Sequence, residues 1–588
     1  MTNRLRVTLI TVALSLVAAG LLPSNARAQF FPANTWYAAG SSAQFNNLAL
    51  ATGLTLSGNS NPLCGSHHWT YSNGAELDDP RSTSILAEKG NIWIVWDDNF
   101  INQVSGKGTV CFMIAVDSVV GNRAFFANAT VKLDEASGTA DGNIVPLLGA
   151  GESLPAAVLD LINGLSPYTT PVKLNVAMSD IRPEDAKFAT IRALETAGTR
   201  IPLDRFTGLG YGPSAIGTPV YSSQSTKQAN VVDYTINGPD PVTGTGSPRS
   251  YSVVSIGAAP VMVIANQTQT GSGHLGDGNY TSIDSWVLQN YLTGTYTHIR
   301  QMAHVSGESD APIHMFQREP ISGTFNTMEY CVALRRDIYL TYNGPGTIGQ
   351  ETGVNPASTS GCPPGSFTPP CTTENGNPFY HVTTSGGATN ATRARVIGTG
   401  EMISTVNSTA DGFGYAFWSF ANFQGKANLK YLAVDGVDPL YSGPAANPGG
   451  VGFLPQCSTS GGVVTSCPIL SFPNIANGGY PIWSVYREIY DPTDSTVYWN
   501  AVPLYARAAA STLLSDFVPS TQLSVFRSHF HQIVITNCTT NCDQAPNNGY
   551  KSGVPETGGD VGGAVLTIQS ELDYINDTGG SQQVDEIE

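Results

Sequence analysis

The stretch VKLNVAMSDIRPEDA, residues 172–186, has the pattern of a strand that runs into a helix. Residues 172–177 (VKLNVA) form a short, mostly apolar run with two β-branched valines, which predicts a strand. Ser179 and Asp180 follow at the turn, and the Pro-Glu-Asp run at 183–185 is typical of the first turn of a helix. A strand, a polar turn and a helix in this order indicate an α/β fold.

The same order recurs along the chain of 588 residues, which is long enough for more than one folding unit. Further strands are predicted at 34–39 (NTWYAA), 91–96 (NIWIVW), 253–265 (VVSIGAAPVMVIA) and 429–434 (LKYLAV). Helices are predicted at 153–163, 182–195 and 322–335. Two segments rich in Gly, Pro, Ser and Thr, 234–250 and 344–393, are predicted to be long surface loops.

The charge balance restricts the partners. There are 28 Lys and Arg against 45 Asp and Glu, a formal net charge of -17, and only 12% of residues are charged. The electrostatic field of a protein with this net negative charge repels nucleic acid and anionic lipid, so neither is expected as a partner. An anionic ligand must therefore be held by local groups.

The N-terminal residues 1–28 have the features of a signal peptide. Arg4 and Arg6 precede an apolar run over 7–22, and Ala-Arg-Ala at 26–28 fits a small-residue cleavage site. The run is shorter than the roughly 20 apolar residues that a membrane-spanning helix needs, so an N-terminal anchor is the less favoured alternative. We expect an exported protein, periplasmic or secreted.

Nine cysteines in an exported chain favour disulfides over metal ligands. Three close pairs each bracket a short loop: Cys362 with Cys371, Cys457 with Cys467, and Cys538 with Cys542. Of the other three, we expect Cys64 to pair with Cys111, which leaves Cys331 as a buried thiol. The alternative is a zinc site from His529, His531, Cys538 and Cys542, but its spacing matches no zinc-finger pattern.

Three strand-to-helix turns gather small polar residues suited to an anion: 39–45 (AGSSAQF), 177–185 and 318–324 (REPISGT). Backbone N–H groups at a helix start attract anions, and hydroxyls beside a fixed guanidinium form a set of donors that fits a tetrahedral oxyanion. Each turn taken alone is more often an ordinary helix start.

Together these motifs resemble the phosphate-binding proteins of bacterial phosphate ABC transporters. The similar segments are VAMSDIRPEDA (176–186), VVSIGAAPVMVIAN (253–266), SWVLQNYLTGTYTHI (285–299), REPISGTFNTME (318–329), DGFGYAFWSFA (411–421), LKYLAVDGVDP (429–439) and NGGYPIWSVYREI (477–489). The resemblance implies the two-lobed type II fold of periplasmic binding proteins, with a crossing hinge and a ligand cleft between the lobes. It divides the chain into the signal peptide 1–28, lobe one at 29–252 and 432–588, and lobe two at 253–431, with insertions around 48–145, 344–393 and near the C-terminus.

The resemblance also implies inorganic phosphate as the ligand, held without a cofactor or metal. The implied ligand residues are Gln44, Phe45, Ser153, Asp180, Arg318, Ser322, Gly323 and Thr324. In this assignment Arg318 supplies the cation, Asp180 accepts a hydrogen bond from the ligand, and the others offer hydroxyl or backbone N–H donors. Ser153 is assigned because Gly-Glu-Ser at 151–153 is the best match for a further serine turn of the family.

The function that the resemblance implies is a monomeric substrate-binding protein, not an enzyme, that serves an ABC-transporter permease in uptake or sensing. Some family members carry an acid two residues after the Arg, where this chain has Pro320, so another oxyanion or small solute stays open. An exported structural or adhesive protein is the second alternative. The sequence contains neither G-x-S-x-G of a serine hydrolase nor H-E-x-x-H of a zinc hydrolase, and His67 and His68 are interpreted as surface or strand residues.

Overall fold

The computed structural model describes residues 32, 34–53, 63–78, 88–104, 107–133, 144–145, 147–183, 186, 249–292, 296, 298–303, 311–318, 322–333, 373–374, 377–384, 387–396, 398–441, 450–461, 463–494 and 516–524. The predicted signal peptide lies outside these residues, as do Cys362, Cys371, Cys538, Cys542, His529 and His531.

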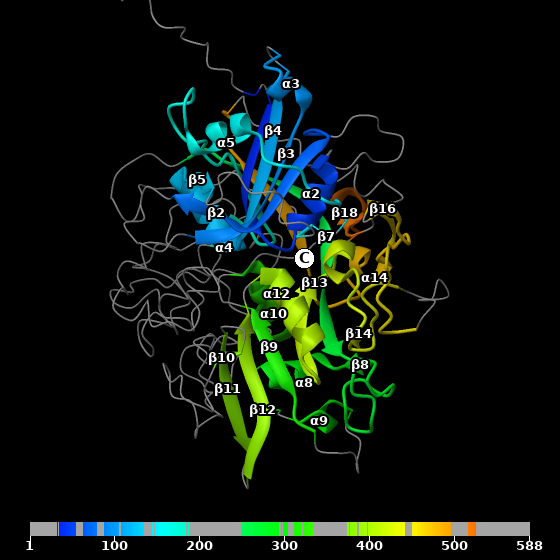
Figure 1. Ribbon diagram of the computed structural model, residues 1–588. Coiled ribbons are helices and arrows are strands. Elements are labelled where there is room, and N and C mark those ends of the chain that lie inside the picture. Colours follow the sequence, from blue (N-terminus) through cyan, green and yellow to red (C-terminus); the bar gives the residue numbers. More distant parts are fainter. Residues whose placement is uncertain are drawn as a thin grey trace, which may run out of the picture.

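The fold is α/β, as predicted, and is built on one large mixed sheet. Figure 1 shows two lobes, one formed by the blue and cyan elements and the other by the green and yellow elements. The strand β7 (Ser252–Asn266) runs through both. Its 15 residues, at about 3.3 Å each, reach about 50 Å, which is long enough to belong to both lobes.

Lobe one contains the half of the sheet with the strand order β7, β17, β6, β1, β4, β3, β2, β5. Its strands are β1 (Asn34–Ser41), β2 (His67–Asp78), β3 (Glu88–Trp96), β4 (Thr109–Val116), β5 (Thr130–Leu133), β6 (Val176–Ser179) and β17 (Trp483–Tyr490). Its helices are α2 (Phe45–Gly53), α3 (Asp98–Ile101), α4 (Ser118–Ala127) and α5 (Ala156–Asn163). In the core Trp36 stacks on Trp93, with ring centroids 5.8 Å apart, and Trp36 Nε1 donates to Glu488 Oε1 at 2.9 Å.

Lobe two contains the other half, with the order β10, β11, β12, β9, β13, β7, and β14 also pairs with β7. Its strands are β8 (Ser282–Ile283), β9 (His314–Arg318), β10 (Thr373–Glu374), β11 (Asn377–Thr384), β12 (Gly387–Val396), β13 (Gly412–Phe417) and β14 (Leu429–Val434). Its helices are α8 (Ser285–Leu292), α9 (Arg300–Ala303), α10 (Gly323–Ala333), α12 (Gly398–Ser408) and α13 (Phe420–Phe423). The remaining elements are β15 (Ser458–Ser460), β16 (Val463–Ser466), α14 (Pro473–Ala476), β18 (Val518–Pro519) and the 3-10 helix η2 (Ser520–Gln522).

The strand β7 changes its partner at Pro260. Residues 252–260 pair with β17 of lobe one, and residues 261–265 pair with β13 of lobe two. Proline has no backbone N–H to donate, so it fits the point where one ladder ends and the next begins.

Two predicted disulfides are confirmed, Cys64 with Cys111 and Cys457 with Cys467, and Cys331 is a buried thiol. Two other sequence interpretations need correction. The segment 344–393 was predicted to be loop, but its described part forms β10, β11 and most of β12. The stretch around 48–145 was taken for an insertion, yet it supplies β4, which pairs with β1 in the middle of lobe one. Every described helix is too short or too polar to span a lipid bilayer.

A buried carboxyl, Asp516, lies beside the hinge. It precedes β18, which pairs with β7, and its Oδ1 accepts the Phe420 N–H at the start of α13, at 2.8 Å. Burial raises the pKa of Asp516 to about 7. The folded protein therefore binds this proton more tightly than the unfolded chain does, and stability is lost as pH rises from about 4 to about 7.

Replacement Asp516→Asn removes that titration and keeps an oxygen to accept the Phe420 N–H. Between pH 5 and pH 8 the parent should lose about 3 kcal/mol of its free energy of unfolding through this group, and the variant should not. The difference in the free energy of unfolding, variant minus parent, is therefore expected to rise by that amount from pH 5 to pH 8. Urea unfolding at the two pH values measures this, with exposed Asp284→Asn as the control. An identical pH dependence for parent and Asp516→Asn would show that the carboxyl does not titrate in this range.

Candidate functional site

Parallel strands end together at one edge of each lobe. In lobe one, β1 pairs in parallel with β4 and β6, with Ser41 opposite Val116 and Gly40 opposite Met178. In lobe two, β9 pairs in parallel with β12, with Arg318 opposite Val396. Polar residues that follow these ends are thus brought to the two edges, which is where ligands bind in open α/β sheets. Figure 1 shows the helices after them, α2 and α4 against α10 and α12, at the junction of the lobes.

Lobe one places Ser118 beside Asp180 by close packing of α4. A Cβ atom on Gly121 would lie 2.4 Å from Gly40 Cα, so only glycine lets α4 approach β1 this closely. Ser118 is the first residue of α4, and its Oγ donates to Asp180 Oδ1. Asp180 follows β6, and its carbonyl accepts the Ser484 hydroxyl at 2.6 Å.

Arg318, the last residue of β9, is fully buried at the junction. Its NH2 group donates to Asp117 Oδ1 of lobe one at 2.7 Å. Its NH1 group donates to Thr324 Oγ1 at 3.4 Å and to Thr399 Oγ1 at 3.3 Å. The guanidinium is thus held by a carboxylate from one lobe and by hydroxyls from two helix starts of the other.

The carboxyl group of Asp180 also lies between the lobes and is 1% exposed. Thr324 Oγ1 donates to Asp180 Oδ2 at 3.4 Å, and a Cβ on Gly323 would lie 2.0 Å from Asp180 Oδ1. Burial raises the pKa of Asp180, against the hydrogen bonds from Ser118 and Thr324 and the field of Arg318. Asp180 is therefore a stronger proton acceptor than an exposed aspartate.

Direct bonds between the lobes complete the cluster. Ser42 Oγ and Thr399 Oγ1 lie 3.1 Å apart, and Thr399 N donates to Ser42 Oγ at 3.0 Å. Nearby, Asn46 of α2 donates to Asn422 of α13. The lobes are therefore closed on each other in this structure.

The cluster combines one guanidinium, four hydroxyls, two carboxyls and the starts of four helices. Donors of this kind suit a tetrahedral oxyanion, and a carboxyl suits an oxygen of it that carries a proton. In the described part of the chain no three His, Cys, Asp or Glu residues are arranged to hold a metal ion.

Seven of the eight sequence-predicted ligand residues come together at this junction. They are Gln44, Phe45, Asp180, Arg318, Ser322, Gly323 and Thr324. Ser153 does not join them: it is exposed, and its neighbour Glu152 pairs with His67 of β2 at 3.0 Å.

Sequence reasoning missed Asp117, Ser118 and Thr399, and it included Ser42 in the 39–45 turn without naming it among the ligand residues. The run TVCFMIAV at 109–116, followed by Asp117 and Ser118, has the same strand-and-turn pattern as 172–180. That signal was present, but the segment was set aside as an insertion. The serine that the structure places beside Asp180 is Ser118.

No family model and no curated protein matches the chain. Among solved structures it is similar to an ABC-type phosphate transport receptor from Vibrio cholerae, at 12% identity over 46% of this chain and 70% of that chain, with a TM-score of 0.22. A phosphate-binding protein from Stenotrophomonas maltophilia matches at 13% identity over 65% and 72%, with a TM-score of 0.25. A high affinity periplasmic phosphate-binding protein with bound phosphate matches at 11% over 83% and 90%, with a TM-score of 0.32. At these values the likeness is a distant one, and the function proposed below rests on the site of this chain.

Closure of the lobes depends on the absence of a side chain at Gly323. Replacement Gly323→Ala puts a methyl group against Asp180 Oδ1 and, at 2.8 Å, against Ser118 Oγ. Alanine favours the helix by about 1 kcal/mol over glycine, so α10 itself should be preserved. We expect the lobes to be held apart, with a larger radius of gyration in small-angle X-ray scattering.

Gly400→Ala is the matched control, because it also lies in the first turn of a helix and its Cβ would meet nothing within 4 Å. This variant should scatter like the parent. A Gly323→Ala protein with the parent's radius of gyration would contradict the closed contact between α10 and Asp180.

Proposed function

We propose that this protein binds inorganic phosphate between its two lobes. The observation that supports it best is the environment of buried Arg318. Its guanidinium contacts the hydroxyls of Thr324 and Thr399, at the starts of α10 and α12, and the same Thr324 hydroxyl also contacts the carboxyl group of Asp180. Fixed N–H and O–H donors around one cation bind a compact oxyanion, and an acceptor among them binds its proton.

Asp180 favours phosphate over sulfate. At neutral pH phosphate carries at least one proton and sulfate carries none. One proton shared between the buried carboxyl and a phosphate oxygen makes a hydrogen bond, whereas sulfate leaves the carboxylate facing an anion. Another protonated oxyanion is the alternative ligand. An exported structural or adhesive protein would not account for a buried arginine held by a carboxylate of one lobe and by two hydroxyls of the other.

The proposed setting is outside the cytoplasm, after removal of residues 1–28. Two disulfides agree with an oxidising compartment. We propose lobe one at 29–252 and 432–588, lobe two at 253–431, and a monomeric binding protein that delivers phosphate to an ABC-transporter permease or reports its concentration. The role is binding, not catalysis.

Inorganic phosphate is expected to raise the melting temperature of the mature protein. A ligand at a hundred times its dissociation constant stabilises the folded state by about 2.7 kcal/mol. Arg318→Ala should abolish most of the shift, because it removes the guanidinium that contacts Asp117, Thr324 and Thr399. Arg300→Ala, at an exposed position, should keep the shift. A melting scan with phosphate, molybdate and simple sugars checks this, and no shift with millimolar phosphate would refute the proposed ligand.

Phosphate should bind much more tightly than sulfate, and Asp180→Asn should narrow the difference. Asparagine carries no charge to repel sulfate, its NH2 can donate to either anion, and its carbonyl is a weaker acceptor for the phosphate proton than a carboxylate. The two anions therefore become more alike, and the difference in binding free energy should narrow by about 1–3 kcal/mol. Calorimetric titration of both anions into both proteins measures the gap. Equal affinities in the parent would assign Asp180 a purely structural role.

A further inference from the structure

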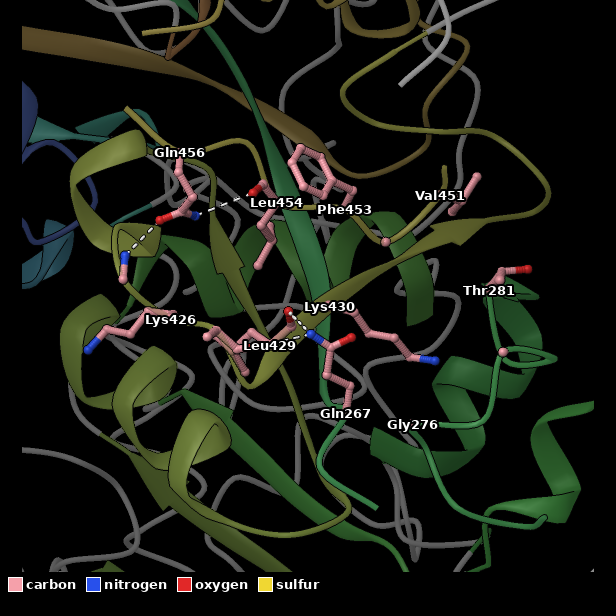
Figure 2. Close-up of a pocket in the computed structure, with 14 residues that line it drawn as sticks. Gln267, Gly276, Thr281, Lys426, Leu429, Lys430, Val451, Phe453, Leu454 and Gln456 are labelled. Carbon is pink, nitrogen blue, oxygen red and sulfur yellow. Dashed lines mark hydrogen bonds between the residues drawn. The ribbon is translucent and has the colours of Figure 1, made fainter. Parts of the chain in front are cut away.

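A cavity of about 530 Å3 lies beside β14 and shares no residue with the Arg318 cluster. Its volume is in the range of small-molecule sites. Three stretches line it: the segment after β7, the turn from α13 into β14, and residues 451–456. In Figure 2 the Lys430 side chain lies between Phe453 on one side and Gly276 on the other.

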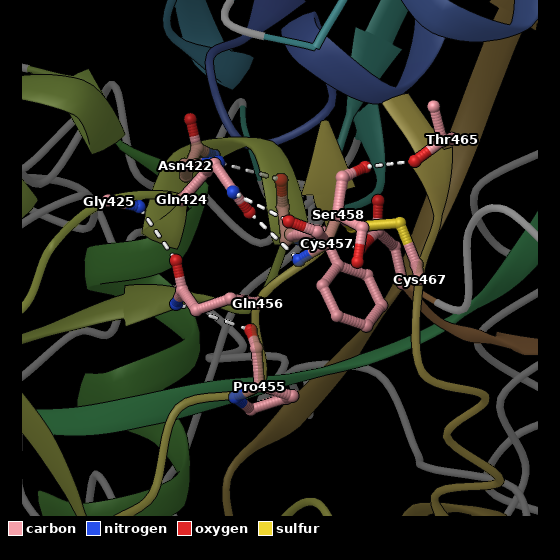
Figure 3. The surroundings of a disulfide bond; sticks show 12 residues. Asn422, Gln424, Gly425, Pro455, Gln456, Cys457, Ser458, Thr465 and Cys467 are labelled. Carbon is pink, nitrogen blue, oxygen red and sulfur yellow. Dashed lines mark hydrogen bonds between the residues drawn. A yellow bond between two sulfur atoms is a disulfide. The ribbon is translucent and has the colours of Figure 1, made fainter. Parts of the chain in front are cut away.

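The wall formed by residues 451–456 is fixed in place by side-chain amides and a disulfide (Figure 3). Gln456 Oε1 accepts the Gly425 N–H at 2.7 Å. Gln424 bonds both the N–H and the carbonyl of Cys457, at 3.0 and 2.9 Å, and Cys457 is joined to Cys467. A wall held by these bonds keeps its shape before any ligand arrives, which lowers the entropy cost of binding.

The cavity carries positive charge, and none of its lining residues is acidic. Its charged lining residues are Lys426 and Lys430, and Lys430 is only 7% exposed. Lys430 Nζ donates to the carbonyls of Tyr280 at 2.7 Å and Asp277 at 3.1 Å, which uses two of its three N–H bonds. Within the described residues no carboxylate pairs with it. Burial lowers the pKa of Lys430 to about 8, against the field of Asp277.

The opposite wall is apolar and open to solvent. Phe453 is 45% exposed and Val451 is 41% exposed, and Leu429 and Leu454 line the same cavity. Large apolar side chains left in water next to a buried cation in a preformed cavity fit a ligand that is anionic at one end and apolar at the other.

We propose that this cavity is a second binding site, for a small organic carboxylate with an apolar tail. The carboxylate forms a direct ion pair with the Lys430 ammonium. The tail packs on Phe453, Val451 and Leu454 and removes them from water. The site does not depend on phosphate binding at Arg318, since the two share no residue.

Sodium octanoate and uncharged octanamide are matched probes, because they have the same tail and differ in the charge at one end. Calorimetric titration at pH 7 is expected to show saturable octanoate binding at least tenfold tighter than octanamide. Lys430→Met should weaken octanoate at least tenfold and leave octanamide within about twofold. Phe453→Ala, at an exposed position, should weaken both probes by threefold or more.

Two controls separate this site from other effects. Lys107→Met removes an exposed lysine and the same net charge, and should leave octanoate binding unchanged. The Arg318→Ala variant should bind octanoate like the parent. The octanoate result is therefore independent of whether phosphate binds at Arg318. The inference is overturned if octanoate does not bind the parent, if octanamide binds as tightly, or if both Lys430→Met and Phe453→Ala retain the parent's affinity for octanoate.

Discussion

The closed arrangement of this protein depends on a buried ion pair between its lobes. Arg318 of lobe two and Asp117 of lobe one lie 2.7 Å apart, with side chains 1% and 3% exposed. A buried pair of this kind contributes little net stability, but loss of one partner costs roughly 3–5 kcal/mol because the other charge stays behind without water. The pair therefore acts mainly on specificity: it disfavours any packing of the lobes that does not bring these two side chains together.

The topology of the sheet brings Arg318 and Asp117 into contact. Each partner stands just after or at the carboxyl end of a parallel strand, Asp117 after β4 and Arg318 at the end of β9. The two halves of the sheet share β7, so their strand ends turn toward one junction. Gly121 then lets α4 settle on β1, and Gly323 lets α10 reach Asp180. Strand direction sets the position of the charges to within a few residues, and two glycines allow the final approach.

Local parts of this site could be predicted from the sequence, and distant parts could not. One motif of seven residues contains Arg318, Ser322, Gly323 and Thr324, so the sequence alone indicates that they act together on an anion. The strands β3, β7 and β14 were likewise predicted from apolar, β-branched runs. Thr399 is different: it follows β12, whose place beside β9 is set by pairing in the folded sheet and leaves no mark near residue 399.

Asp117 and Ser118 were missed for a related reason. Only the pairing of β4 with β1 shows that their strand is central rather than inserted, and no spacing in the sequence gives that pairing. The same applies to the cavity around Lys430, whose lining residues run from Gln267 to Gln456. A cavity is a property of packing, and its apolar and cationic residues are individually unremarkable in the sequence.

The carboxylate that pairs with Arg318 belongs to Asp117, on the opposite lobe. In some relatives of the family that the sequence resembles, an acid follows the arginine by two residues, and here that residue is Pro320. A carboxylate on the arginine's own lobe would stay paired whether the lobes were together or apart. Asp117 lies on the other lobe, so it neutralises Arg318 only when they close. With the lobes apart, the guanidinium keeps Thr324 and Thr399 as neighbours but has no carboxylate from Asp117, and it then attracts an anion from solution most strongly. In the closed arrangement the carboxylate of Asp117 pairs with Arg318 and water is excluded, so the pairing of this permanently charged arginine depends on contact between the lobes.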